Sequence, residues 1–565
     1  MKKTFLLCSA ALLGATLLQA AGNPATFTKL TTPVKDGALP ATRIAGAVTI
    51  FGDYNNDGLL DIFCIGGEDA SNPSIALFKN NGQNQWEAVT LPTDATPLAQ
   101  ASAIWIDYNN DGNLDLIVSG LDASSTCKLY ALKNLGGDKG FTLDNDCSFG
   151  FGVKHENSNT QSMSVIDYNN DGWMDFIITG TPDSWNMCYD WRCTAIYINQ
   201  KGSFSNEHMY TSFNKRNGNV FVCDINSDGL FDVFNTGYGD NGLEYGANGH
   251  LNTGDGYSTL SGVTFTASVT GVAFTVDVNN DGLQDIIQIT RNPSENPWSN
   301  YAAVWLYDGT TYTQKENCGI TGGDAVISIG DINNDGNIDI YYSGYPNMRI
   351  AYGNGDGTFT ESTFSDDLAE LGCRGGYVNM VDIDGDNLLD IQSNGYCDAK
   401  GGYYNTIAKN TTANITNQAP TAPTNLTVTP TTNGGYKLTW EAGTDDKTPV
   451  KALRYNVIAT TKDGKTFAIN PADLNTGKQK VAGGYTPYLN TLFYEFNSQE
   501  FTTFYVQTID GANVGSAFAS VKVNDTTTAC DEVIATPTAK KIIRNGHMLI
   551  LKDGNYYNAL GVTIQ

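Results

Sequence analysis

The chain has 565 residues and a formal net charge of −27 at pH 7, with 60 Asp and Glu against 33 Lys and Arg. This negative charge argues against nucleic acid and anionic membrane surfaces as partners. With 16% charged residues, 41% hydrophobic residues and 60 glycines, the composition is typical of a folded, turn-rich protein with many short strands. The length predicts two or three domains.

Residues 1–20 have the pattern of a signal peptide. Lys2 and Lys3 precede an apolar run, and Leu18-Gln19-Ala20 is a candidate cleavage site. No later apolar stretch is long enough to span a bilayer. We therefore expect an exported protein, either secreted or held at the outer cell surface.

A nine-residue acidic motif recurs seven times after this segment. The first copy, residues 53–61, reads Asp-Tyr-Asn-Asn-Asp-Gly-Leu-Leu-Asp. The copies begin at positions 53, 107, 167, 224, 277, 331 and 382, and a period of this size indicates a repeat architecture. Three aspartates in each of six copies and four in the seventh account for 22 of the 60 acidic residues. Much of the negative charge therefore belongs to the motif.

Each copy carries oxygen-bearing side chains at positions 1, 3, 5 and 9. Positions 1, 3 and 5, with Gly at position 6, match the first half of a calcium-binding EF-hand loop. Asp, Asn and Gly are also ordinary turn formers, but seven copies in register favour a metal site. The predicted ligands of up to seven calcium ions are Asp53, Asn55, Asp57, Asp61, Asp107, Asn109, Asp111, Asp115, Asp167, Asn169, Asp171, Asp175, Asp224, Asn226, Asp228, Asp232, Asp277, Asn279, Asp281, Asp285, Asp331, Asn333, Asp335, Asp339, Asp382, Asp384, Asp386 and Asp390.

The seventh copy departs from the other six. Its Gly385 lies at position 4, so Asn387 at position 6 must adopt the left-handed conformation, which Asn tolerates. Asp384 places an additional carboxylate at position 3, and we expect it to compensate for the change.

A constant pattern of four short strands surrounds each motif. In the second repeat, residues 103–106 precede the motif, residues 116–118 follow it, and residues 129–133 form a third strand. A Gly/Asn turn then leads to a fourth strand opened by an aromatic residue, as at Phe359 in the sixth repeat. Four strands per repeat and seven repeats predict an all-β fold that begins with a seven-bladed β-propeller, over residues 21–412.

The repeats resemble the FG-GAP/VCBS family and, more distantly, the integrin α-chain propeller, over about residues 25–412. This resemblance implies calcium in the loop between the first and second strands of each blade, and a role in adhesion, scaffolding or sometimes catalysis. After Asn410 the last repeat runs into a linker, whereas residues 25–30 resemble a fourth strand. We therefore expect the N-terminal strand to complete the last blade, which removes an exposed sheet edge.

A linker at residues 413–423 leads to a second domain, residues 424–523. Its alternating strands resemble a fibronectin type III-like β-sandwich, with Trp440 in the core and Tyr505 on a strand. The middle of this domain, residues 467–494, is long and irregular for that family. We interpret Asp445-Asp446 as a turn.

A second linker, residues 524–540, precedes a predicted small β-meander at 541–565. Asn545-Gly546 and Asp553-Gly554 separate apolar runs there, which is typical of tight turns between strands. The segment resembles the short C-terminal sorting segments of exported Bacteroidota proteins related to type IX secretion. This resemblance implies a signal or docking role.

Ten cysteines remain after the signal segment, and an exported protein can form disulfides. Cys188 and Cys193 are the favoured pair because they lie close in one loop. Cys127 with Cys147 is a second possible pair. Cys64, inside an apolar run, is expected to be a buried free thiol.

The sequence contains no recognisable catalytic constellation: the four histidines are scattered, and the nucleophile and metalloprotease motifs are absent. Because antiparallel strands alternate in direction, the loops between second and third strands lie at the end of the blades opposite the acidic loops. Aromatic side chains there suit sugar stacking or a protein partner. We expect a monomeric binding or adhesion protein for a glycan or an extracellular protein. The candidate ligand-binding residues are Trp185, Tyr189, Trp191, Arg192 and Trp298, with Tyr238, Tyr245, Tyr301, Tyr345 and Tyr396 as further aromatics.

Two alternatives stay open at this point. The first is a polysaccharide lyase or hydrolase with its site in the propeller funnel, because some calcium-binding propellers have such activity. The second is a passive spacer without a ligand.

Overall fold

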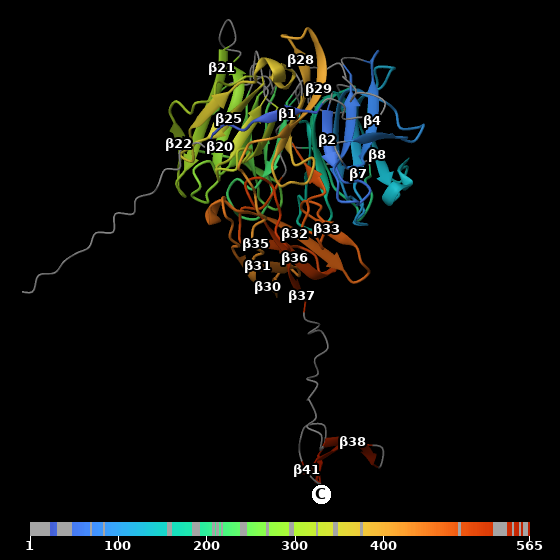
Figure 1. The fold of residues 1–565 in the computed structure, drawn as a ribbon. Coiled ribbons are helices and arrows are strands. Elements are labelled where there is room, and N and C mark those ends of the chain that lie inside the picture. The colour runs from blue at the N-terminus through green and yellow to red at the C-terminus, as the bar shows by residue number, and fades with distance from the viewer. Residues whose placement is uncertain are drawn as a thin grey trace, which may run out of the picture. The chain divides into compact units, whose positions relative to one another are not determined.

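The computed structural model is all-β (Figure 1). In the part of the chain that it describes, helix is confined to the short 3-10 turns η1 (Gly137–Lys139), η4 (Asp366–Gly372) and η5 (Val450–Ala452), and no helix there is long and apolar enough to cross a membrane. The described residues are 23–30, 48–67, 70–82, 85–154, 161–183, 193–205, 209–210, 214–215, 218–237, 246–266, 271–292, 299–323, 326–342, 348–372, 377–483, 487–523, 539–544, 547–552, 555–557 and 563–564.

Seven antiparallel sheets each carry one acidic loop between their first and second strands, and we call them repeat sheets 1 to 7. In chain order their strands are β2 (Val48–Gly52), β3 (Asp61–Gly66), β4 (Ser74–Asn80) and β5 (Trp86–Val89); β6 (Ala99–Ile106), β7 (Asp115–Leu121), β8 (Cys127–Asn134) and β9 (Phe141–Leu143); β11 (Met163–Ile166), β12 (Asp175–Pro182), β13 (Cys193–Tyr197) and β14 (Met209–Tyr210), with β10 (Val153–Lys154) also paired to β12; β15 (Val220–Cys223), β16 (Asp232–Asn235), β17 (Asn248–Asn252) and β18 (Tyr257–Thr259); β19 (Val272–Val276), β20 (Asp285–Asn292), β21 (Ser299–Tyr307) and β22 (Tyr312–Lys315); β23 (Ile327–Gly330), β24 (Asp339–Tyr342), β25 (Arg349–Gly353) and β26 (Phe359–Ser362); and β27 (Val378–Val381), β28 (Asp390–Cys397), β29 (Gly402–Asn410) and β1 (Phe27–Lys29).

The first strands of successive repeat sheets lie beside one another. β6 contacts β2, β11 contacts β6, β15 contacts β11, and β19 contacts β15. One hydrophobic cluster joins residues of β19 and β23, and β27 contacts both β23 and β2. The second strands β3 and β7 are buried along their whole length because each sheet is covered by its neighbours, which explains their continuous apolar sequences.

The N-terminal strand completes repeat sheet 7, as predicted. β1 pairs with β29 in antiparallel register, with Phe27 opposite Asn410 and Lys29 opposite Ala408 (Figure 1). Two further backbone hydrogen bonds extend the pairing, from Leu30 to Ile407 (3.0 Å) and from Thr411 to Thr26 (2.7 Å). The N-terminus therefore covers an edge that would otherwise be open.

A polar network joins repeat sheets 7 and 1, the last and the first in the chain, and we call this join the seam. The Asn379 amide donates to the Thr49 carbonyl (3.0 Å) and to Gln392 Oε1 (2.6 Å). Gln392 Nε2 donates to Asn405 Oδ1 (2.7 Å), and Asn405 Nδ2 donates to Thr49 Oγ1 (3.3 Å). Buried amides bonded in this way fix the position of two sheets that are more than 300 residues apart in the sequence.

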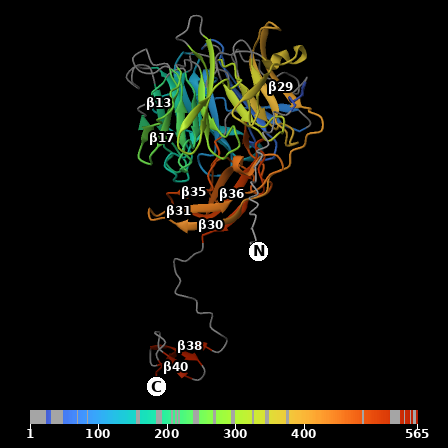
Figure 2. The same ribbon diagram turned by 90° about the vertical axis from the view of Figure 1, so that its left-hand side faces the viewer.

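Residues 424–522 contain two packed sheets, which we call the two-sheet region (Figure 2). Aromatic pairs such as Tyr436–Phe504 and Trp440–Tyr455 connect the sheets, and Trp440 is buried as predicted. Asp445 accepts hydrogen bonds from the Lys447 and Thr448 amides, so the predicted turn there is confirmed. The sheets comprise β30 (Thr424–Pro430), β31 (Tyr436–Glu441) and β35 (Phe493–Phe496), and β33 (Thr466–Ala468), β32 (Arg454–Thr461), β36 (Phe501–Ile509) and β37 (Ala519–Lys522).

One segment of the two-sheet region joins a repeat sheet. β34 (Val481–Ala482) pairs with β2, the first strand of repeat sheet 1. This segment lies inside the irregular stretch 467–494. Its irregularity therefore has a structural role, because it adds a fifth strand to repeat sheet 1.

Residues Met1–Val521 form one compact unit, and Lys522–Gln565 form a second. The second unit is an antiparallel sheet whose strands follow chain order: β38 (Ala539–Arg544), β39 (His547–Lys552), β40 (Asn555–Tyr557) and β41 (Thr563–Ile564). The strands predicted on either side of Asn545-Gly546 and Asp553-Gly554 are present.

Removal of the N-terminal strand should destabilise the protein. A variant that begins at Asp36 loses β1 and the half-buried Phe27, which packs against the cluster around Tyr341 and Ile391. We expect a clearly lower melting temperature and aggregation, because β29 becomes an unpaired edge. Differential scanning calorimetry and light scattering measure both effects against a control that begins at Asn23. Equal melting of the two proteins as monomers would contradict this role of β1.

Candidate functional site

Each acidic loop contains two residues with left-handed backbone. Position 6 is Gly in six loops, with φ between 82° and 90°, and position 4 is Asn or Ser in the same loops, with φ between 52° and 61°. In the seventh loop Gly385 occupies position 4 (φ 78°) and Asn387 position 6 (φ 67°), which confirms the prediction for Asn387. The exchange keeps Gly at one of the two left-handed positions, so the seventh loop remains in register with the others.

The aspartate at position 1 organises the loop backbone. In the first loop, Asp53 Oδ1 accepts a hydrogen bond from the Asp57 amide (3.0 Å) and Oδ2 accepts one from the Gly58 amide (2.9 Å). Position 1 of each of the other six loops accepts the same two bonds. These bonds close a tight turn that brings the side chains of positions 1, 3 and 5 near one another.

The aspartate at position 9 is buried in every repeat, at 0 or 1% exposure. In the first repeat, Asp61 Oδ1 accepts a hydrogen bond from the Asn80 amide at the end of the third strand (2.7 Å). Its Oδ2 accepts a bond from the Tyr54 amide at position 2 (3.2 Å). A carboxylate has about four acceptor sites, so these bonds leave room for a cation as well.

Burial leaves these carboxylates without full charge compensation. Burial raises the pKa of Asp61, Asp232 and Asp390 to about 8, and backbone hydrogen bonds offset part of that rise. A cation in the loop would favour the ionised form of such groups.

The donor set fits a hard cation. Six loops offer three carboxylates and one amide oxygen, and the seventh offers four carboxylates. Among the described residues, buried oxygens of three loops, Asp115 Oδ2, Asn333 Oδ1 and Asp384 Oδ1, have no hydrogen-bond partner. Calcium prefers oxygen ligands of this kind.

The two-sheet region covers the acidic loops. The Lys480 carbonyl accepts a bond from the Asp53 amide (2.8 Å) in the first loop, and Lys480 Nζ donates to the Gly112 carbonyl (3.0 Å) in the second. The Asn497 amide donates to the Asn170 carbonyl (2.7 Å) in the third loop. In the fourth and fifth loops, Asn490 Nδ2 bonds Ser227 Oγ (2.8 Å) and Lys451 packs on Gly282. In the sixth loop, the Gly511 carbonyl accepts a bond from the Asp331 amide (2.8 Å). The seventh loop contacts a residue just before the two-sheet region, because Asn387 Nδ2 donates to the Asn417 carbonyl (3.5 Å).

The glycines at position 6 permit this close approach. A Cβ on Gly172 would lie 2.2 Å from the Phe501 ring, and one on Gly336 would lie 2.5 Å from the Lys447 carbonyl. Gly172 and Gly336 therefore serve both the loop conformation and the contact with the two-sheet region, whereas Gly58 and Gly112 face open space.

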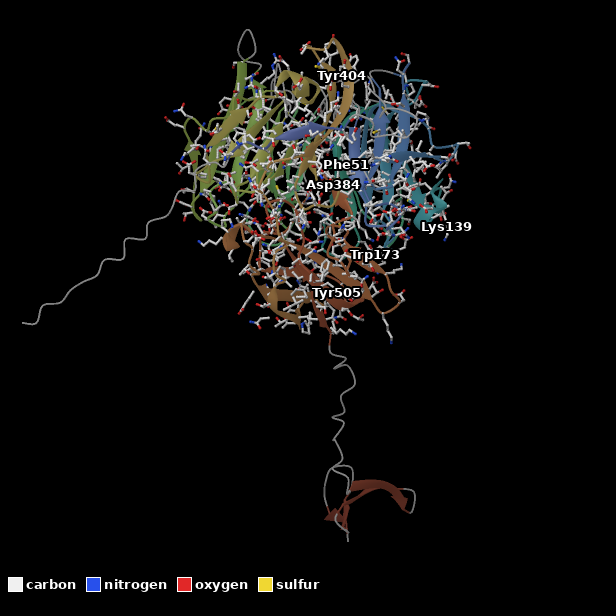
Figure 3. The ribbon with its side chains drawn as sticks, in the orientation of Figure 1. Phe51, Lys139, Trp173, Asp384, Tyr404 and Tyr505 are labelled. Atoms are coloured by element: carbon white, nitrogen blue, oxygen red, sulfur yellow. The ribbon has the colours of Figure 1, made fainter. Side chains whose placement is uncertain are left out.

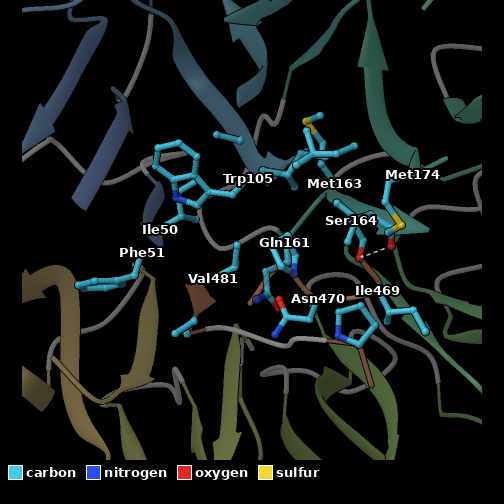
Figure 4. Close-up of a pocket in the computed structure, with 18 of the residues that line it drawn as sticks. Ile50, Phe51, Trp105, Gln161, Met163, Ser164, Met174, Ile469, Asn470 and Val481 are labelled. Atoms are coloured by element: carbon cyan, nitrogen blue, oxygen red, sulfur yellow. Dashed lines mark hydrogen bonds between the residues drawn. The ribbon is translucent and has the colours of Figure 1, made fainter. Parts of the chain in front are cut away.

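A cavity of about 110 Å³ lies between the first strands of repeat sheets 1 to 4 and 7 and the two-sheet region (Figure 4). Its lining is mostly apolar, with Trp105, Phe51 and Met163 on the repeat sheets. Gln161 points into the same space as Asn470 and Val481 in Figure 4, and its Nε2 donates to the Tyr377 hydroxyl (3.1 Å). The cavity is therefore bounded by the two-sheet region on one side and bridged by side chains across the repeat sheets.

The predicted ligand-binding residues lie outside the described residues: Trp185, Tyr189, Trp191, Arg192 and Trp298, together with Tyr238, Tyr245 and Tyr345. Two of the further aromatics are described. Tyr301 packs on the hydrophobic cluster of repeat sheets 4 to 6, and Tyr396 forms an edge-to-face pair with Tyr403 at 5.0 Å.

Cys193 is disulfide-bonded, whereas its predicted partner Cys188 lies outside the described residues. The possible Cys127–Cys147 pair is wrong, because both are free thiols. Cys127 is buried on β8 and directs its Sγ to the Thr181 carbonyl (3.7 Å), while Cys147 lies near Asp144. Cys64 is a buried free thiol, as predicted.

Sequence reasoning missed an asparagine that ends the third strand in four repeats and follows it by two residues in the third repeat: Asn80, Asn134, Asn252 and Asn410, and Asn199. In four of them the side-chain amide also bonds position 2 of the preceding repeat; Asn199, for example, donates to the Tyr108 carbonyl (2.7 Å). Its position, 19 to 24 residues after position 9, is a signal that was present in the sequence.

Asn199→Ala should destabilise the protein by about 2–3 kcal/mol, because the Tyr108 and Met174 carbonyls lose buried donors. Urea denaturation followed by tryptophan fluorescence measures this change. Asn81→Ala is the matched control, because Asn81 bonds Glu87 at the exposed surface and its loss should cost less than about 0.5 kcal/mol. Equal effects of the two substitutions would contradict the role of Asn199 as a link between repeats.

The FG-GAP-like repeat family matches residues 53–118, 167–235, 277–342 and 331–392. All seven acidic loops lie within these ranges. A T-cell immunomodulatory protein of Rattus norvegicus is 27% identical over 157 residues, which are 27% of this chain and 22% of that protein. The chain thus matches less than a quarter of this relative's length.

Three solved structures show a remote likeness. An Agrocybe aegerita lectin that recognises non-reducing terminal N-acetylglucosamine has 16% identity and a TM-score of 0.39, over 56% of this chain and 80% of its own. The BP39L lectin of Burkholderia pseudomallei has 12% identity and a TM-score of 0.39, over 72% and 99%. A fungal alcohol oxidase of the AA5 family, in complex with copper, has 12% identity and a TM-score of 0.46, over 88% and 99%. The sequence matches establish that this chain contains four FG-GAP-like repeats.

Proposed function

We propose that the protein is an exported, calcium-stabilised β-propeller that binds a glycan or protein ligand outside the cell. The seven repeat sheets form the blades, and the N-terminal strand closes the ring. The contacts between successive first strands, which return from β27 to β2, support this arrangement. The two-sheet region is a fibronectin type III-like accessory domain, as the buried Trp440 and the two packed sheets suggest.

Calcium binds in the acidic loops through positions 1, 3, 5 and 9. The bound ion supplies positive charge among buried carboxylates. The chain itself holds these oxygens in place, through the amides that bond position 1 and the third-strand amide that bonds position 9. The buried oxygens Asp115 Oδ2 and Asn333 Oδ1, which have no hydrogen-bond partner among the described residues, support this assignment.

The N-terminal signal pattern and the disulfide-bonded Cys193 support export, because disulfides persist in oxidising compartments. The second unit then acts as a sorting or docking segment at the cell surface. The propeller functions as a monomer.

The observation that carries the binding assignment is the cover over the acidic loops. The two-sheet region contacts six of them, and Asn417, just before that region, contacts the seventh, so that the chain itself covers this end of the repeat sheets. Antiparallel strands place the loops between second and third strands at the other end. An external ligand therefore binds there, where variable loops are held by a rigid scaffold.

A polysaccharide lyase or hydrolase with its site in the funnel has less support. Among the described residues that line the cavity between the repeat sheets and the two-sheet region, Asp107 is the one acid. Both of its carboxylate oxygens accept backbone hydrogen bonds, from Asp111 (3.0 Å) and Gly112 (2.8 Å).

Removal of calcium should lower the melting temperature strongly at neutral pH. At about ten- to a hundredfold excess of calcium over Kd, each site contributes about 1.4–2.7 kcal/mol. Calorimetry with and without chelator, together with elemental analysis, measures this effect. Asp335→Asn should remove one bound ion, whereas Asp308→Asn, at an exposed turn with Thr310 and Thr311, should remove none. A protein that binds no calcium and melts at the same temperature with and without chelator would contradict the assignment of calcium to the acidic loops.

A glycan array and a panel of extracellular proteins should identify a ligand whose binding depends on the third repeat. The double variant Trp185→Ala with Trp191→Ala should lose binding and keep its calcium content and melting temperature. Release of reducing sugars or unsaturated products from a polysaccharide panel would instead favour the enzyme. Normal binding by the double variant, or its unfolding, would count against these residues as the ligand site.

A further inference from the structure

Lys409 occupies a strand position whose occupants differ between the repeats. It directly precedes Asn410, whose amide bonds the position-9 aspartate Asp390 (2.7 Å). The equivalent residues of repeat sheets 1 to 6 are Lys79, Lys133, Ile198, Leu251, Leu306 and Tyr352. Three repeats therefore place a lysine beside the acidic loop, and four do not.

Of the three lysines, Lys409 engages two carboxylates of its own loop. Its ammonium donates to Asp384 at position 3 and lies 3.3 Å from Asp386 at position 5. Lys79 instead makes its short contact, 2.6 Å, with Asp138 outside the loop and lies 3.8 Å from Asp57. Within the described part of the chain, Lys133 makes no ion pair with its loop.

The acids of the seventh loop converge more closely than those of the other loops. Carboxylate oxygens of Asp382, Asp384 and Asp390 all lie within 4.8 Å of one another, and no other group of three acids in the described residues does so. Carboxylates repel one another unless a cation lies among them. Lys409 contacts one acid of this group, Asp384, which is labelled in Figure 3.

The sequence of the seventh loop matches this contact. The other six loops carry Asn at position 3, whereas the seventh carries Asp384, the acid that Lys409 bonds. Lys409 also lies opposite Thr28 in the pairing of β29 with the N-terminal strand β1. The lysine and the added acid therefore occur together, at the seam between the two ends of the repeat region.

We propose that the Lys409 ammonium is the resident cation of the seventh loop, so that this loop holds its carboxylates together without calcium. The inference rests on the proposed calcium binding of the other six loops. The join between repeat sheets 7 and 1 then does not depend on calcium, whereas the other six loops do. The expected capacity is then six ions per chain at most.

The test compares bound calcium per chain in wild type, Lys409→Met and the matched control Lys133→Met. Equilibrium dialysis with elemental analysis should give one more ion for Lys409→Met than for wild type, and no change for Lys133→Met. In chelator, Lys409→Met should melt several degrees below wild type, and calcium should restore most of the loss. An unchanged ion count in Lys409→Met would overturn the proposal.

A second variant covers the case in which Lys409→Met does not fold. Lys409→Met with Asp384→Asn gives the seventh loop the three aspartates and one asparagine of the other loops, and it should fold in calcium and bind the additional ion. Failure of this variant to fold in calcium would mean that no ion can replace the lysine, and would overturn the proposal. If no form binds calcium, the proposed function fails, whereas lower melting of Lys409→Met in chelator would still identify Lys409 as the cation of the loop.

Discussion

The repeat region depends on how buried carboxylates obtain partners. Each repeat places one aspartate, at position 9, almost entirely out of water, where an isolated negative charge is costly. A backbone amide at or just after the end of the third strand meets this demand in part in every repeat, and among the described residues the position-2 amide does so in six of them. In the proposed function, a cation in the loop would offset the charge that remains, and folding of the repeats would then be linked to ion binding.

The same loops also form the interface with the two-sheet region. Four of the six glycines with positive φ at position 6, Gly172, Gly229, Gly282 and Gly336, present bare backbone to Phe501, Phe493, Lys451 and Lys447 of the two-sheet region. Lys480 bridges the first two loops, with its carbonyl on one and its ammonium on the other. The two-sheet region thus covers part of the acidic surface within the first compact unit, while Asp57, Asp111, Asp228 and Asp386 at position 5 stay exposed.

Long-range polar contacts close the arrangement where the repeat pattern is interrupted. At the seam, β1 takes the place of a fourth strand, and the network of Asn379, Gln392 and Asn405 links the last sheet to the first. Elsewhere, Gln161, just before β11 of repeat sheet 3, bonds Tyr377, just before β27 of repeat sheet 7, and β34 pairs with β2. These contacts join residues that no local pattern connects. They fix the positions of these sheets relative to one another, which the sequence of a single repeat does not determine.

The sequence alone determined the repeat, the strands around each loop, the left-handed Asn387, the N-terminal strand in the last sheet and the buried state of Cys64. These features follow from local rules: the period of apolar residues, the few residues that accept positive φ, and the need to cover a sheet edge. Only the tertiary structure decided that the two-sheet region covers the acidic loops, that Lys409 meets Asp384 and Asp386, and that Cys127 and Cys147 are separate thiols. Those outcomes depend on surfaces brought together across more than 400 residues, such as Asp53 with Lys480. Spacing along the chain carries no information about such contacts, because they are set by how completed sheets pack.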